Sequence, residues 1–214
     1  MNKLAILCGL MLFASGAAMA SGSNERLTGD AEAGQEKSVT CAACHGQTGN
    51  SATGDFPNIA GQHNKYLVKQ LMDYRLGAQT NGESGRHNIL MADQAINLSD
   101  QDIYDLAAFY SAQEHALGSV DEDIVTEAQR LFLGGDTERG ITSCAACHGP
   151  GGFGMGLAAF PMLQGQHAKY TADQLKQFRS GNRNNDPNGM MRDIASRLTD
   201  RDIEILSQYI NGLY

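Results

Sequence analysis

The stretch CAACHG occupies residues 41–46 and recurs, letter for letter, at residues 144–149. Each copy places two cysteines three positions apart, with a histidine directly after the second. If the stretch forms a turn of helix, Cys41, Cys44 and His45 lie at i, i+3 and i+4 and share one face. Each copy then offers two thiols and one imidazole to the same neighbouring group.

The similarity between the two parts of the chain extends beyond the cysteines. FPNIAGQHNKYLVKQL (56–71) aligns with FPMLQGQHAKYTADQL (160–175), and LSDQDI (98–103) aligns with LTDRDI (198–203). Two similar halves of about 95 residues therefore follow one another. The expected boundaries are 21–113 for the first domain, 114–125 for a linker and 126–214 for the second domain.

Residues 1–20 have the composition of a secretory signal peptide. Lys3 precedes a short apolar run at 4–13, and small residues follow up to Ala20. The run is short for a membrane span. We therefore predict cleavage after Ala20, which removes Cys8, and export to an oxidising compartment. The alternative interpretation is a buried N-terminal helix.

Charge and composition restrict the function of the remaining chain. Without Lys3, 15 of the 16 basic residues remain against 24 acidic ones, so the net charge is −9. We expect no binding to nucleic acid, because its phosphates need a basic face. No later segment has the length and hydrophobicity of a membrane span. With 25 glycines and no tryptophan, each core is expected to be thin enough to need a cofactor as filler.

Each half reads as mostly helical. Apolar residues within 103–110 recur at i, i+3, i+4 and i+7, which is one face of a helix. Ser99 and Thr199 each stand three residues before an aspartate, a pattern typical of a helix start. Two further helices are expected at 66–74 and 170–178, closed by the glycines at 77 and 181. Because no convincing strand pattern occurs, we predict an all-α chain of two small helical domains in tandem.

The C-x-x-C-H pattern is typical of c-type haem attachment, in which two thiols add to the haem vinyl groups and the imidazole reaches the iron. Two other chemistries compete with this interpretation. A zinc site built from all four cysteines would join the two halves and leave both histidines unexplained. A thioredoxin-like disulfide belongs on a strand–helix unit that the sequence does not suggest. We therefore predict one haem in each half.

Each iron then needs a second axial ligand opposite the histidine, His45 or His148. Met91 lies seven residues before Leu98, and Met191 lies seven before Leu198, so the two methionines occupy matching positions. We choose this pair as ligands, each in a loop before the last helix of its half, with Met190 as the fallback for Met191. The alternative role of these methionines is core packing.

The histidines of the repeated GQH string are rival ligands. His63 and His167 follow the Phe-Pro loops and precede the expected helices. They can bind iron, cap the helix that follows, or contact a haem propionate.

These features together resemble the cytochrome c4 family of di-haem cytochromes c, over essentially the whole exported chain. The resemblance implies two class I cytochrome c domains related by an approximate two-fold axis, with one covalently bound haem c in each and haem edges facing across the interface. It implies the following sets of thioether and iron ligands: Cys41, Cys44, His45 and Met91 for the first haem, and Cys144, Cys147, His148 and Met191 for the second.

The same resemblance assigns roles to the repeated Phe-Pro pairs. Pro57 and Pro161 match the proline whose carbonyl orients the iron-binding histidine, because a bound Nδ1 proton sets the tautomer and ring angle. Their alternative role is that of turn residues. Phe56 and Phe160 pack either on the porphyrins or in an ordinary core.

The resemblance also implies a function. The chain is expected to be a periplasmic electron carrier, soluble or loosely attached to the membrane, rather than an enzyme. Its expected donor is a quinol–cytochrome c reductase and its expected acceptor a terminal oxidase. The alternatives are a haem subunit of a periplasmic dehydrogenase and a di-haem peroxidase, which needs an open position on one iron.

Five arginines cluster in the sequence around Met191. They either steer docking onto an acidic partner or form a solvated face paired with nearby acids. The five are Arg179, Arg183, Arg192, Arg197 and Arg201.

Overall fold

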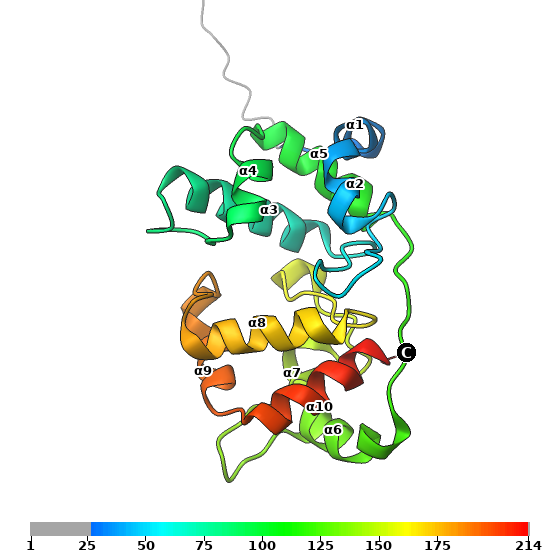
Figure 1. Cartoon of the computed structure of the whole chain (residues 1–214), viewed down its shortest axis with the longest axis vertical. Coiled ribbons are helices and arrows are strands. Elements are labelled where there is room, and N and C mark those ends of the chain that lie inside the picture. The colour runs from blue at the N-terminus through cyan, green and yellow to red at the C-terminus, as the bar shows by residue number, and fades with distance from the viewer. Residues whose placement is uncertain (1–26, 214) are drawn as a thin grey trace, which may run out of the picture.

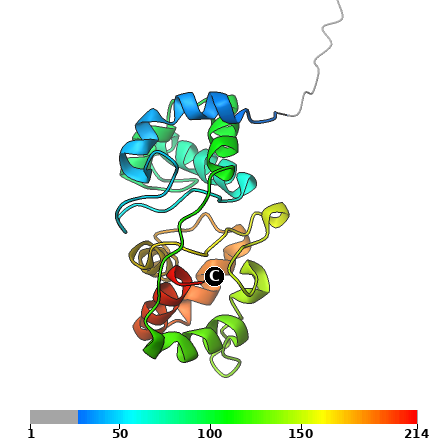
Figure 2. The same cartoon turned by 90° about the vertical axis from the view of Figure 1, so that its right-hand side faces the viewer.

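The computed structural model describes residues 27–213 (Figure 1). The predicted signal peptide and its cleavage site lie outside these residues. Two helical domains are stacked along the long axis, and the chain between them runs down one side of the molecule (Figures 1 and 2). Among the described residues, no helix combines the length and the apolar character needed to cross a membrane.

The first domain is formed by five helices. In chain order these are α1 (Ala31–Lys37), α2 (Val39–His45), α3 (Asn64–Gln79), α4 (Ile89–Ala95) and α5 (Asp100–Ser111). Helix α5 packs against α1 and α3, and α4 packs against α3. The buried face of α5 supplies Ile103, Leu106 and Ala107 to the core, as the sequence periodicity predicts.

The second domain repeats this arrangement. Its elements are α6 (Glu122–Gly134), α7 (Ala145–His148), the 3₁₀ turn η1 (Gly156–Ala158), α8 (Ala168–Ser180), the 3₁₀ turn η2 (Pro187–Gly189), α9 (Met190–Ser196) and α10 (Asp200–Asn211). Helix α10 packs against α6 and α8, and α9 packs against α8. Residues 27–213 contain only isolated β-bridges and no named strand. The predicted all-α tandem fold is confirmed.

The last helix of each domain begins at the predicted residue. The Ser99 hydroxyl accepts a hydrogen bond from the Asp102 amide, and the Asp102 carboxylate accepts one from the Ser99 amide. Thr199 and Asp202 repeat this reciprocal pair at α10. Both boxes satisfy amides that the first helical turn would otherwise leave unpaired.

The two glycines expected to end helices behave differently. Gly181 ends α8 with φ 79°, in the left-handed region that a glycine adopts without strain. The prediction that a helix ends at Gly77 was wrong, because α3 continues through this residue to Gln79. A Cβ atom at Gly77 would lie 2.3 Å from the Arg86 carbonyl oxygen. The glycine is therefore required by the close approach of a neighbouring loop rather than by a helix end.

At the domain interface, one glutamine from each domain bonds a loop of the other domain. The Gln62 side chain donates to the Met162 carbonyl and accepts from the Met162 amide, both at 2.9 Å. Gln166 makes the same pair of bonds with Asn58, at 2.8 and 2.9 Å. Each glutamine side chain thus pairs with both the amide and the carbonyl of one residue in a loop of the other domain. The two pairs match each other, as expected of an approximate two-fold arrangement.

We predict that Gln62→Leu lowers the free energy of unfolding by about 2 kcal/mol, because the Met162 amide and carbonyl lose their partner. Chemical denaturation of the haem-loaded protein measures this change. Gln94→Leu, at an exposed position of α4, is the matched control and should stay within about 0.5 kcal/mol of the parent. Equal effects of the two variants would contradict an interface role for Gln62.

Candidate haem-binding sites

Both CAACH copies fold as helical turns. Helix α2 ends at His45, and α7 ends at His148. Cys144 is the N-cap residue of α7 and already has helical backbone angles, with φ −62° and ψ −38°. The four cysteines are not joined in disulfides. Within residues 27–213 no cluster of cysteine, histidine or acidic side chains has the arrangement of a metal site. The structure therefore does not support the zinc alternative or the disulfide alternative.

The two histidines share the same environment. Both side chains are largely buried, with 8% and 7% of the residue exposed for His45 and His148. His45 Nδ1 lies 2.9 Å from the Pro57 carbonyl oxygen, and His148 Nδ1 lies 2.9 Å from that of Pro161. A carbonyl only accepts, so Nδ1 carries the proton and Nε2 keeps its lone pair.

Burial lowers the pKa of both imidazoles, although the proline carbonyl acts in the opposite direction. The rings are therefore neutral at neutral pH, which is the form that binds a metal. Phe56 and Phe160 stand beside them, each with a ring centroid 6.4 Å from that of the histidine. The repeated Phe-Pro pair thus supplies a ring and a carbonyl to the same imidazole.

The chemistry of the cysteines suits thioether formation. Burial raises the pKa of Cys144 to about 11 and also raises the pKa of Cys41. Both therefore remain protonated thiols at neutral pH. Two thiols and a buried neutral imidazole on one helical turn fit the requirements of a covalently attached haem, with Nε2 available to its iron.

The two candidate methionines occupy matching places. Met91 is in the first turn of α4, where the Asn88 side chain accepts a hydrogen bond from its amide at 2.9 Å. Met191 is in the first turn of α9, beside the more exposed Met190. The prediction that these residues lie in loops was wrong, because a short helix precedes the last helix in each domain. Both methionines are half-buried.

The repeated histidines of the GQH string serve the interface. Each stands at the N-terminus of its helix, α3 or α8, but makes no capping bond through its side chain. His63 Nε2 lies 2.7 Å from the Phe153 carbonyl oxygen, and His167 Nε2 lies 3.1 Å from that of Ser51. Each imidazole therefore contacts a loop of the other domain.

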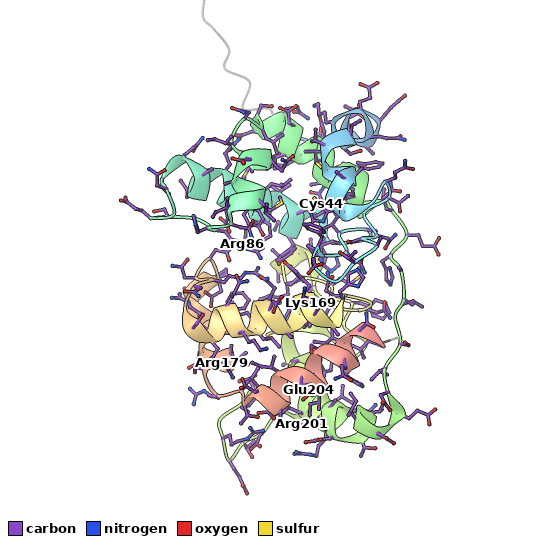
Figure 3. All side chains as sticks on the ribbon, viewed as in Figure 1. Cys44, Arg86, Lys169, Arg179, Arg201 and Glu204 are labelled. Atoms are coloured by element: carbon purple, nitrogen blue, oxygen red, sulfur yellow. The ribbon has the colours of Figure 1, made fainter. Side chains whose placement is uncertain are left out.

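Four of the five clustered arginines form ion pairs on the surface of the second domain. The pairs are Arg179 with Asp200, Arg192 with Asp186, Arg197 with Asp193, and Arg201 with Glu127 and Glu204. Figure 3 shows Arg179 and Arg201 on this domain. Arg183 is different, because it is 7% exposed and lies at the domain interface. Its burial contradicts both alternatives considered for it, docking onto an acidic partner and a place on a solvated face.

The cytochrome c family model matches residues 31–112 and again residues 127–213. Two such domains, each with its own Cys-x-x-Cys-His turn, define a di-haem c-type cytochrome. The chain is 45% identical to cytochrome c4 of Stutzerimonas stutzeri over the full length of both chains. It also matches the crystal structure of reduced recombinant cytochrome c4 from Pseudomonas stutzeri, with a TM-score of 0.85, 46% identity and coverage of 87% of this chain and 100% of that one.

The chain therefore belongs to the cytochrome c4 family, as a di-haem electron-transfer protein with two covalently bound haem c groups. A second relative has a different name. The thiosulfate dehydrogenase electron acceptor of Stutzerimonas stutzeri is 40% identical, over 80% of this chain and 77% of that protein.

We predict that the double variant Cys41→Ser/Cys44→Ser carries one covalently bound haem in place of two, because a hydroxyl does not form the thioether. Cys144→Ser/Cys147→Ser should lose the other haem. Intact mass under denaturing conditions counts the haems in each variant. Ala42→Ser/Ala43→Ser changes the two intervening positions and is the matched control, which should retain both haems. Retention of two haems in either cysteine variant would contradict the assignment.

Proposed function

We propose that this chain carries electrons in the periplasm from a quinol–cytochrome c reductase to a terminal oxidase, with one histidine and one methionine on each iron. The observation that carries the proposal is the matched pair of half-buried methionines, Met91 and Met191, in the first turns of α4 and α9. The same position is used in both domains, as expected of a ligand.

Bound haem supplies a one-electron couple between ferric and ferrous iron. The chain contributes the ligand environment of that couple. His45 and His148 present Nε2 because their Nδ1 protons are held by proline carbonyls. A methionine thioether is a soft, weak donor that favours ferrous iron and raises the potential above that of a bis-histidine site. A histidine and a methionine on each iron would leave no position for a substrate, which disfavours the peroxidase alternative.

The donor and the acceptor are proposed on the resemblance to cytochromes c4, and the similarity over the full chain supports that resemblance. Cleavage after Ala20 would release the chain into the periplasm, where peripheral attachment to the membrane would keep it near both partners. A second candidate function is electron acceptance from a periplasmic dehydrogenase. Its support is the 40% identity to the thiosulfate dehydrogenase electron acceptor.

We predict that Met91→Leu and Met191→Leu each remove half of the weak far-red absorption band that accompanies ferric iron bound to a thioether. The reason is that leucine fills the same volume but has no donor atom. Absorption spectra of the oxidised holoprotein measure the band. Met190→Leu is the matched control and should leave it unchanged. If Met190→Leu removes half of the band and Met191→Leu does not, the register of the second ligand is wrong.

We also predict that the holoprotein restores quinol-driven oxygen uptake to membranes that contain a quinol–cytochrome c reductase and a terminal oxidase but have been washed free of cytochrome c. An oxygen electrode measures the uptake, and the protein without haem is the control. If uptake is not restored, and the haems are reduced only when thiosulfate and a thiosulfate dehydrogenase are supplied, the second candidate function is correct.

A further inference from the structure

Two arginines are buried at the interface between the domains. Arg86 lies between α3 and α4, and Arg183 lies at the corresponding place between α8 and α9. They are 6% and 7% exposed, respectively. Figure 3 places Arg86 at the edge of the first domain that faces the second. A buried guanidinium is costly unless its donors are bonded and its charge is compensated.

Arg86 is held by side chains from both domains. Its guanidinium donates to Gln70 Oε1 at 2.8 Å within its own domain. It also donates across the interface to Gln174 Oε1 at 2.6 Å and to the Tyr170 hydroxyl at 3.3 Å. All three acceptors are neutral, so these bonds satisfy the donors without cancelling the charge.

Arg183 repeats the arrangement in the opposite direction. It donates to Gln174 Oε1 at 2.8 Å within its own domain. Across the interface it donates to the Tyr66 hydroxyl at 3.0 Å and to Gln70 Oε1 at 3.2 Å. Gln70 and Gln174 therefore each accept from both arginines, which links the two guanidinium groups through shared oxygens.

The two aromatic neighbours leave the positive charge in place. The Arg86 guanidinium lies 4.6 Å from the centroid of the Tyr74 ring, and that of Arg183 lies 4.4 Å from the Phe178 ring. These ring faces stabilise a cation without neutralising it. Within residues 27–213, neither arginine forms an ion pair with a carboxylate, because each of its hydrogen bonds goes to a neutral acceptor.

The electrostatic effect of the cluster reaches a neighbouring phenol. Burial alone would raise the pKa of Tyr66, yet the two arginines lower it below its usual value. At Tyr74, burial raises the pKa and outweighs the opposite effect of Arg86, which contacts the face of the ring. The interface between α3 and α8 is therefore a positively charged, water-poor region.

Such a region affects electron transfer in both domains. Reduction adds one electron to an iron without changing any bond in the chain, so nearby positive charge favours the reduced form, and burial limits screening by water and salt. Arg86 precedes Met91 by five positions and Arg183 precedes Met191 by eight, in the connections that lead to α4 and α9.

We propose that Arg86 and Arg183 act as one shared cationic cluster that raises the reduction potentials of both haems, so that each arginine tunes the haem of the other domain as well as its own. They are positioning residues rather than ligands. The inference depends on the two covalently bound haems and not on the identity of the methionine ligands, which the far-red band reports separately.

The test compares full-length holoproteins with Arg86→Met and Arg183→Met. The potential of each haem is followed through its own methyl resonances in NMR spectra recorded at a series of solution potentials. In either variant we expect both haems to become harder to reduce. A tenfold change in the reduction equilibrium corresponds to about 59 mV for a one-electron couple. Arg86→Lys keeps the positive charge, so both reduction potentials should stay close to those of the parent protein.

Arg75→Met is the matched control, because it removes one positive charge from the same domain. Arg75 is already paired with Asp100 at 2.5 Å and bonds the Leu98 carbonyl, so both potentials should change less than in Arg86→Met. A shift confined to the haem of the mutated domain would overturn the shared cluster, and so would equal shifts in Arg75→Met. If Arg86→Met does not accumulate with two haems, the mirror variant Arg183→Met decides the question.

Discussion

The hydrogen bond between a buried imidazole and a proline carbonyl is the constraint on which the rest of each domain depends. It joins the C-terminus of the Cys-x-x-Cys-His turn to a loop twelve or thirteen positions further along the chain. Because Nδ1 is held there, the tautomer and the ring angle of the imidazole are set, and Nε2 keeps its lone pair for a metal. The cysteines of the same turn then lie on the face that the imidazole defines. This bond thus prepares each histidine for the role that we propose for it on the iron.

The second constraint is the exchange of polar side chains between the domains. Glutamines 62 and 166 replace a missing backbone partner in the opposite loop, and the imidazoles beside them bond carbonyls there. Further along the interface, two arginines share two glutamine oxygens. A polar interface of this kind favours one relative orientation of the two domains, because any other would leave buried donors unpaired at a cost in free energy. It therefore holds the two cofactor sites at a defined orientation.

Much of the fold and of the candidate site could be predicted from the repeated motifs. The helix starts at Ser99 and Thr199 are local patterns, and the structure confirms them. Two of the errors concern residues whose role depends on distant contacts. Gly77 looks like a helix end but makes room for the Arg86 carbonyl. Arg183 looks like a surface charge, because the two connections differ in length and hide its correspondence with Arg86.

The sequence by itself determined the helical class, the duplication and the chemistry of the two Cys-x-x-Cys-His turns, since each depends on residues a few positions apart. Only the tertiary structure decided which polar residues serve the interface. From the sequence, the repeated histidines at 63 and 167 can bind iron, cap a helix or contact a haem propionate, whereas in the structure each bonds a carbonyl of the other domain. Spacing along the chain specifies which groups share a helical face, whereas burial and charge compensation depend on what the folded chain brings to that face.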